Sequence, residues 1–348
     1  MRTFPALMVL TMATGCTAFD RPVASSAITA TTATVQALGE TEAVETRNAD
    51  AADDPAIWRN PVDPSASLIV ATDKRAGLHV YALDGKDRSF VAAGRVNNVD
   101  LRDMGKAGII VAVSDRSDPA AAMVALFRLD PLAATLVPLG KVPVGTGEAY
   151  GVCLYRKDAA LFAFNVLKDG TINQVALDLS GPAPTGRTVR TMKLATQSEG
   201  CVADDRTGRL YVAEEDVGVW RFDTAASGGW AGRKVADVDG SRIVADTEGV
   251  TIAAEGRGDG GYLLVSSQGD NAYAVYRLRD DAFVGRFRIA AGAFGATEET
   301  DGIDIAVGDV GGRFPDGLFV AQDGQNQPRA QNFKMVAWAD IKRALKLR

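Results

Sequence analysis

Short motifs recur along the chain at intervals of about fifty residues, and this period limits the fold more than any other feature of the sequence. The six motifs are Asp54-Pro55-Ala56-Ile57, Asn98-Val99-Asp100, Tyr150-Gly151-Val152, Glu199-Gly200-Cys201, Glu248-Gly249-Val250 and Asp301-Gly302-Ile303. Repeats of roughly 40–50 residues that each contain several short strands are typical of β-propellers. We therefore predict an all-β chain that forms a single six-bladed β-propeller.

Each unit continues in the same way after its motif. The β-rich apolar runs that follow the six motifs are residues 67–71, 108–113, 161–164, 210–213, 262–265 and 317–321. A polar loop and a further strand come next, with Gly, Asp, Asn and Pro at the turns. Helical periodicity is confined to residues 339–345. We expect the segment around Glu40 to Thr46 to supply the last strand of the sixth blade and so to close the ring.

The first residues have the pattern of an export signal. Arg2 precedes an apolar run from Phe4 to Ala13, which is too short to span a bilayer. Because Ala13-Thr14-Gly15-Cys16 resembles a bacterial lipobox, we predict a signal peptide over residues 1–15 and lipidation of Cys16. This predicts an outer-membrane or cell-surface lipoprotein; without lipidation the chain would be periplasmic or secreted. Residues 16–39 are rich in Ala, Thr and Ser and are predicted to be a flexible tether, followed by the propeller over residues 40–348.

The charge of the chain and its few histidines narrow the range of partners and chemistries. The sequence has 38 Lys and Arg against 44 Asp and Glu, a net charge of -6, which argues against nucleic acid as a partner. His79 is the single histidine, so a zinc site built on several histidines is excluded and a Ser-His-Asp triad would depend on His79 alone. Cys153 and Cys201 could form a disulfide or remain buried thiols, and both alternatives stay open.

Blade geometry would bring polar loops from all six units to one face of the ring. In an antiparallel blade, the start of the first strand and the loop after the second strand share a face. The loops of the first three units carry Lys74-Arg75, Arg116 and Lys168, whereas those of the last three carry Glu214-Glu215-Asp216, Gln268-Gly269-Asp270 and Gln322-Asp323-Gly324. The sequence therefore predicts a basic sector beside an acidic one. Aspartate is also common in turns, so Asp73, Asp270 and Asp323 are equally compatible with a purely structural role.

The acidic sector predicts a cation. Asp54, Glu199, Glu248 and Asp301 add carboxylates near the axis, and crowded carboxylates repel one another unless a cation lies among them. All the ligands available on this face are oxygens, which favours Ca2+ over Mg2+ or Zn2+. Several calcium ions beside a basic patch would suit a polyanion such as a phosphate ester.

With these motifs the sequence resembles the β-propeller phytases, the calcium-dependent alkaline class. The matching stretches extend over most of residues 40–345 and include Asp50-Ala-Ala-Asp-Asp-Pro-Ala-Ile-Trp58, Gly94-Arg-Val-Asn-Asn-Val-Asp100, Gln197-Ser-Glu-Gly200, Ala245-Asp-Thr-Glu-Gly249, Ser266-Ser-Gln-Gly-Asp-Asn271 and Thr300-Asp-Gly-Ile-Asp304. The resemblance implies a 3-phytase that releases inorganic phosphate from phytate, myo-inositol hexakisphosphate, taken as its calcium salt. It also implies attack by metal-activated water without a covalent intermediate.

The resemblance further implies roles for individual residues. Calcium would be held by Asp53, Asp54, Asn97, Tyr150, Glu199, Glu215, Glu248, Gln268 and Asp301. Phosphate would be bound by Lys74, Arg75, Arg116 and Lys168, and catalysis would depend on Asp54, Glu199, Glu215, Lys74 and Arg116. Glu42 matches a carboxylate near the closing strand. Gly295 stands where relatives often carry Asp, and Glu298 or Glu299 could substitute for that carboxylate.

Two other functions are compatible with a calcium-binding propeller. A lactonase-type hydrolase would use the metal to polarise an ester carbonyl, but it has no need of Lys74, Arg116 and Lys168. A non-catalytic binding propeller at the cell surface would show calcium-dependent melting without turnover. In every case we expect a monomer, and for either hydrolase we expect a small-molecule substrate.

Overall fold

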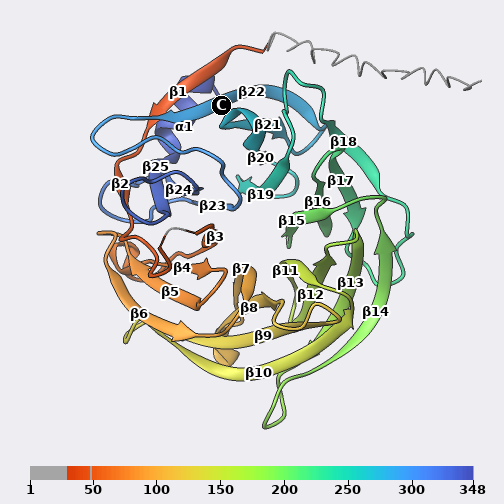
Figure 1. Cartoon of the computed structure of the whole chain (residues 1–348). Coiled ribbons are helices and arrows are strands. Elements are labelled where there is room, and N and C mark those ends of the chain that lie inside the picture. Colours follow the sequence, from red (N-terminus) through yellow and green to blue (C-terminus); the bar gives the residue numbers. More distant parts are fainter. Residues whose placement is uncertain (1–29, 48, 348) are drawn as a thin grey trace, which may run out of the picture.

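The computed structural model describes residues 30–47 and 49–347, which form six sheets around a central axis (Figure 1). Within each sheet the strands follow one another from the axis to the rim. The predicted six-bladed β-propeller is therefore confirmed. The predicted signal peptide and Cys16 lie outside the described residues.

The blades share one four-stranded plan. In blades one to three the strands are β3 (Ala52–Trp58), β4 (Leu68–Asp73), β5 (Gly77–Ala82), β6 (Asp87–Ala92); β7 (Val96–Asp103), β8 (Ile109–Asp115), β9 (Ala121–Asp130), β10 (Thr135–Thr146); and β11 (Ala149–Lys157), β12 (Ala160–Leu167), β13 (Thr171–Asp178), β14 (Thr185–Lys193). In blades four to six they are β15 (Ser198–Asp204), β16 (Arg209–Glu214), β17 (Gly218–Asp223), β18 (Arg233–Asp237); β19 (Thr247–Ala254), β20 (Gly261–Ser267), β21 (Ala272–Arg277), β22 (Ala282–Ala290); and β23 (Ile303–Val307), β24 (Gly317–Asp323), β25 (Asn332–Ala337) with β2 (Gly39–Glu40).

The repeated motifs lie where the period predicts them. Each falls in, or directly before, the innermost strand of a blade, and the apolar runs form the second strands β4, β8, β12, β16, β20 and β24. Three short 3-10 helices interrupt the loops: η1 (Pro64–Ala66), η2 (Gly105–Ala107) and η3 (Gln268–Asp270). The predicted C-terminal helix is α1 (Trp338–Leu345). No helix in the described part of the chain is long and apolar enough to cross a membrane.

The glycine in four of the motifs is required by the close approach of neighbouring blades. A Cβ atom at Gly151 would lie 2.0 Å from the carbonyl oxygen of Glu199, and one at Gly200 would lie 2.4 Å from that of Glu248. The same holds at Gly249, whose amide donates to the carbonyl of Asp301 on the next blade. The motif therefore packs the innermost strands around the axis, and it holds the preceding polar residue at the start of each strand.

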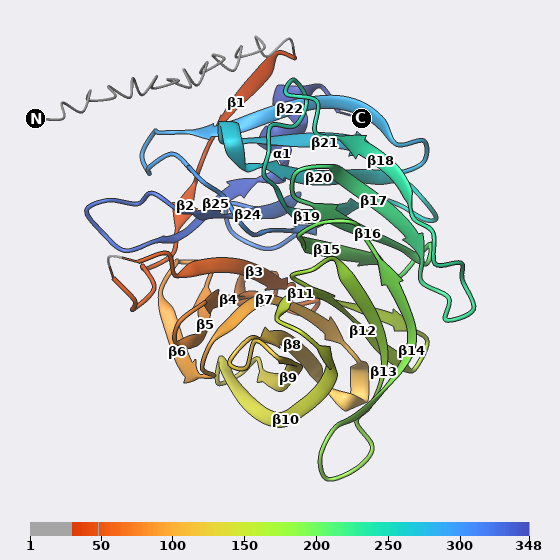
Figure 2. The same ribbon diagram turned by 45° about the vertical axis from the view of Figure 1, so that its right-hand side comes forward.

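The first described residues close the ring and also extend a second blade. Strand β2 pairs with β25 of the sixth blade, at the beginning of the predicted segment, and the amides of Thr41 and Val44 continue the contact with that blade. Upstream, β1 (Thr32–Gln36) pairs in parallel with β22 at the rim of the fifth blade (Figures 1 and 2). The flexible tether predicted for residues 16–39 is thus wrong over 32–36, because these residues find hydrogen-bond partners along the free edge of β22.

Six apolar clusters form the core, and each lies between two adjacent blades. One of them joins the sixth blade to the first through Tyr81, Phe314 and Phe333, all buried, together with Val44 of the closing segment. The other five join the remaining pairs of neighbours in the same manner. The stability of the ring therefore depends on contacts between blades as much as on the sheets themselves.

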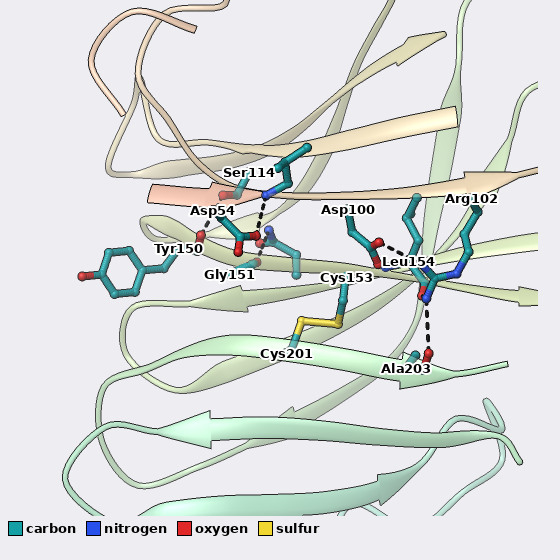
Figure 3. The surroundings of a disulfide bond; sticks show 12 residues. Asp54, Asp100, Arg102, Ser114, Tyr150, Gly151, Cys153, Leu154, Cys201 and Ala203 are labelled. Atoms are coloured by element: carbon teal, nitrogen blue, oxygen red, sulfur yellow. Dashed lines mark hydrogen bonds and ion pairs between the residues drawn. A yellow bond between two sulfur atoms is a disulfide. The ribbon is translucent and has the colours of Figure 1, made fainter. Parts of the chain in front are cut away.

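A disulfide bond links the innermost strands of two neighbouring blades. Cys153 of β11 and Cys201 of β15 are bonded, with their Cα atoms 5.8 Å apart (Figure 3). Of the two alternatives for these cysteines, the structure therefore supports the disulfide. Such a bond is typical of proteins that mature in an oxidising compartment.

Candidate active site

A cavity of about 710 Å3 opens on the face where the innermost strands begin. Its wall combines the starts of these strands with the loops that follow the second strands, as blade geometry predicts. Seven of the residues predicted for the site line it: Lys74, Tyr150, Glu199, Glu215, Glu248, Gln268 and Asp301. Residues from blades one, three, four, five and six therefore meet in one place.

Three glutamates form the acidic centre of the cavity. Oxygen atoms of Glu199, Glu215 and Glu248 lie within 4.8 Å of one another, and all three side chains are buried. Burial raises the pKa of Glu199 and Glu248 well above the usual range, and the charges of nearby carboxylates raise it further. The buried Oε1 atom of Glu215 has no hydrogen-bond partner. This group of carboxylates could hold a metal ion, which would supply the missing partner and relieve the repulsion.

A second group of carboxylates lies around Lys74 on the first-blade side. The Lys74 ammonium is 2.8 Å from Asp301 Oδ2, 2.9 Å from Asp50 Oδ2 and 3.8 Å from Asp53 Oδ1. Asp53 is 1% exposed, and neither of its side-chain oxygens has a hydrogen-bond partner. Burial raises its pKa to about 7, although Lys74 opposes the shift. Asp53 therefore also offers oxygens suited to a cation.

The predicted basic sector is present beside the cavity, with one exception. Arg116 Nη2 lies 3.1 Å from Glu148 Oε1, and the Arg116 guanidinium and Lys168 ammonium lie over the ring of Tyr150. Arg75, however, is exposed and does not line the cavity, and its Nε donates to the carbonyl of Asp50. A role of Arg75 in binding phosphate therefore stays a prediction, for a side chain that lies outside the cavity wall.

The two predicted amide ligands present their NH2 groups to carboxylates. Asn97 Nδ2 donates to Glu199 Oε1 at 2.8 Å, while its Oδ1 accepts from Arg116. Gln268 Nε2 donates to Asp301 Oδ1 at 2.6 Å. Both amides thus orient acidic residues, and Asn97 also connects a basic residue of the second blade to the glutamate centre.

Asp54 is separated from the cavity by the alternation of side chains along β3. It lines the central channel, a cavity of about 350 Å3, where its Oδ2 accepts the amide of Val99 at 3.0 Å. Burial first, and then the charge of neighbouring Asp53, raises its pKa. The structure therefore places Asp54 in a contact between blades one and two (Figure 3 shows it beside Ser114 and Tyr150).

Several acidic loop residues have structural partners, so the acidic sector is smaller than the sequence predicts. Asp73 accepts the amides of Thr46 and Arg75. Asp270 pairs with buried Arg286, and Asp323 lies 2.9 Å from the ammonium of buried Lys334. For these three aspartates the structure supports the turn role.

Glu42, and Gly295 where relatives often carry Asp, also lie outside the glutamate centre. Glu42 Oε2 accepts the amide of Asp87 and so ties the closing segment to the first blade. A Cβ atom at Gly295 would lie 3.6 Å from the Lys334 ammonium. Glu298 and Glu299, by contrast, do line the cavity.

Among the residues of the cavity wall that sequence reasoning missed are Asp50, Gln197, Asp246 and Arg329. The first three lie within the stretches that carry the family resemblance, so the same motifs contained the signal. Gln197 Nε2 lies 3.5 Å from the Tyr150 hydroxyl, and Arg329 Nη1 is 2.7 Å from Glu40 Oε1. Arg329 belongs to the loop between β24 and β25, where no motif marks it.

Comparisons with known proteins agree with this arrangement. The family model described as Phytase matches residues 2–347 of the chain. A curated relative, the 3-phytase of Bacillus subtilis (strain 168), is 40% identical in an alignment of 324 residues that covers 88% of this chain and 84% of that protein.

Proposed function

The chain belongs to the phytase family, and on that premise we propose that it is a 3-phytase that hydrolyses phytate in a calcium-dependent reaction. One observation carries the proposal most directly. A centre of three buried glutamates lies in the same cavity as Lys74, with Arg116 and Lys168 at its edge over Tyr150. A substrate with several phosphate groups would find both a cation site and basic side chains there.

The donor atoms support calcium as the metal. Glu199, Glu215 and Glu248 supply carboxylate oxygens, and Asp53 and Asp301 add more on the other side of the wall. Calcium prefers six to eight oxygen ligands and tolerates irregular geometry. When bound, it would neutralise phosphate charge and lower the pKa of a bound water molecule.

The side chains of the protein would perform the remaining steps. Lys74, Arg116 and Lys168 would bind phosphate oxygens, Arg116 through a planar guanidinium that can donate two parallel hydrogen bonds. None of the described residues lining the cavity is Ser, Thr, Cys or His. The carboxylates that remain as nucleophiles would be occupied by the cation, and we therefore propose that water attacks phosphorus without a covalent intermediate.

We also propose that the chain is exported and acts as a monomer. The disulfide between Cys153 and Cys201 supports an oxidising destination, and the sequence before Cys16 supports a signal peptide with lipid attachment. Labelling cells with a radioactive fatty acid tests the anchor. Incorporation that disappears in Cys16→Ser would support it, and absence of incorporation in the natural sequence would contradict it.

Release of inorganic phosphate from calcium phytate tests the proposed function. We expect release that stops on addition of EDTA and resumes with excess Ca2+. Glu215→Gln should lower the rate by more than about 100-fold, because even outer-shell partners of metal ligands cost roughly 10–100-fold. Glu45→Gln, the same change at an exposed position, is the control. Release that survives EDTA, or a fully active Glu215→Gln protein, would contradict the proposal.

A further inference from the structure

Two cationic side chains from neighbouring blades lie over one aromatic ring at the edge of the cavity. The ring is that of Tyr150, at the start of the third blade. The Arg116 guanidinium carbon is 5.3 Å from the ring centre and the Lys168 ammonium is 5.0 Å from it. Both distances are within the range in which the negative face of an aromatic ring attracts a cation.

The two cations differ in their other contacts. Arg116 is also held by Asn97 and by Glu148. The Lys168 ammonium, in contrast, makes no hydrogen bond or ion pair within residues 30–47 and 49–347, and it lies over the ring of Tyr150. Apart from the charge of Glu215, the Tyr150 ring is therefore what holds the half-buried Lys168 side chain beside the like charge of Arg116.

The backbone that carries the ring is held from two sides. Ser114 Oγ of the second blade donates to the Tyr150 carbonyl at 2.7 Å, and the adjacent Gly151 packs against the fourth blade. In Figure 3 the side chain points away from the disulfide that joins β11 to β15. The backbone of Tyr150 is thus placed by three blades, and its ring can serve as a support for the two cationic side chains.

We propose that the ring of Tyr150 is a positioning element that holds Arg116 and Lys168 as a pair for a phosphate dianion. This role belongs to the ring and is separate from any contact of the hydroxyl with a metal. The inference rests on the proposed function, because it assigns these cations to the phosphate groups of the substrate. The pair supplies two positive charges, which match the double charge of a phosphate monoester.

Calorimetry of inorganic phosphate binding at saturating Ca2+ distinguishes the contribution of the Tyr150 ring from that of its hydroxyl. Tyr150→Phe removes only the hydroxyl and keeps the ring, so it should bind phosphate more tightly than a variant without the ring, even where more Ca2+ is needed for saturation. Tyr150→Leu removes the ring and should raise the Kd about 5- to 30-fold, the effect of losing two partly buried cation–π contacts. Tyr155→Leu, which removes a ring from the same strand, should leave the Kd unchanged.

A double-mutant cycle with Lys168→Met identifies the cation concerned. Lys168→Met should weaken phosphate binding much less in the Tyr150→Leu background than alone. If Tyr150→Leu does not fold, Tyr150→Met takes its place in both experiments. Equal Kd values for the Leu variant and the natural protein, or equally weak binding by the Phe and Leu variants, would overturn the inference.

Phosphate release from phytate is followed in parallel. A natural protein that binds inorganic phosphate but does not hydrolyse phytate would contradict the proposed function and leave the ring experiment valid. A natural protein that does not bind inorganic phosphate at all would overturn the inference itself.

Discussion

At the scale of single residues, the site is built from one motif used several times. The acidic residue before the repeated glycine begins an innermost strand, so Glu199, Glu248 and Asp301 reach the same cavity from blades four, five and six. Glu215 joins them from the loop after β16. Charges brought together in this way raise one another's pKa and create a strong demand for a cation.

Calcium affinity should increase with pH because of these shifted carboxyl groups. Burial raises the pKa of Asp53 from 3.8 to about 7, so a cation that binds there below pH 7 must displace a proton. We expect the affinity to rise as the pH increases towards 7, with release of protons on calcium binding over that range. Calorimetry in two buffers of different ionisation enthalpy measures both effects.

Asp53→Asn should weaken calcium binding and flatten its pH dependence, whereas Asp158→Asn, at an exposed turn with positive φ, should change neither. An affinity that is constant from pH 5 to pH 8 would show that the protonation of Asp53 is not linked to metal binding.

Sequence reasoning located this site because the motifs and the blade period together determine which side chains share a face. It could not decide which aspartates are turn residues: Asp270 and Asp323 each pair with a buried cation, Arg286 and Lys334, that lies on a later strand of the same blade. Nor could it predict that β3 directs Asp54 into the channel, since its register there depends on contact with Val99 of the next blade.

At the scale of elements, ring closure depends on a buried lysine. The Lys334 ammonium of β25 is fully buried and lies 2.8 Å from Glu40 Oε2 of β2 and 2.9 Å from Asp323 Oδ2. Two amide oxygens, of Asn326 and Asn332, complete its surroundings. Strands β2 and β25, which close the ring, are thus joined by an ion pair as well as by backbone hydrogen bonds.

Lys334→Met should destabilise the protein strongly. Removal of the ammonium leaves buried Asp323 without its ion-pair partner and leaves Glu40 with Arg329 alone, and breaking a buried pair in this way typically costs about 3–5 kcal/mol. Denaturant-induced unfolding measures the loss, with Lys106→Met, at an exposed position, as the control. A change below 1 kcal/mol would mean that the closing strand is held without this ion pair.

The same joint should be sensitive to acid. Burial alone would raise the pKa of Glu40, but hydrogen bonds from Arg329 and Lys334 lower it from 4.5 to about 2. The ionised side chain therefore stabilises the folded state above pH 4.5, and this contribution is lost as the pH falls towards 2. Thermal unfolding between pH 5 and pH 2 should show a steeper decrease in Tm for the natural protein than for Glu40→Gln. Parallel curves of Tm against pH would argue against a contribution of ionised Glu40 to stability.

The disulfide is a second joint, between blades three and four. The double variant Cys153→Ser/Cys201→Ser should lose about 2–4 kcal/mol of unfolding free energy, since the bond closes a loop of 48 residues. Mass spectrometry of the unreduced protein first verifies the bond. If the double variant unfolds at the same denaturant concentration as the natural protein, the contacts between β11 and β15 suffice without it.

Most strands were predictable because the same pattern repeats in every unit. A strand that is poorly marked in one blade can be located from the corresponding strands of the other blades. Strand β1 has no counterpart in the repeat, and its Ala- and Thr-rich sequence does not differ from that of a linker. It becomes a strand only because β22 offers a free edge. The cysteine pairing was likewise decided by the distance between two blades, which spacing in sequence does not determine.

At the scale of the whole molecule, the fold and the site have separate supports. The six cores lie between blades, and ring closure uses Lys334, which cannot dissociate from the chain. Chelation should therefore abolish phosphate release while the far-ultraviolet circular dichroism at 25 °C remains that of the folded protein. The Tm should fall, because a ligand that binds only the folded state stabilises it. Unfolding by EDTA at 25 °C would contradict this separation.

The pairing of β2 with β25 also has a consequence in time. Glu40 and Lys334 are 294 positions apart, so at a synthesis rate of about 5–20 residues per second the first partner waits roughly 15 to 60 s for the second. During that interval the apolar surface that Tyr81 and Val44 later share with Phe333 has no covering blade. Until β25 has been synthesised, the blades form an open arc with two unprotected ends. The closure of the ring, rather than the folding of any single blade, therefore sets how long the chain needs protection from aggregation.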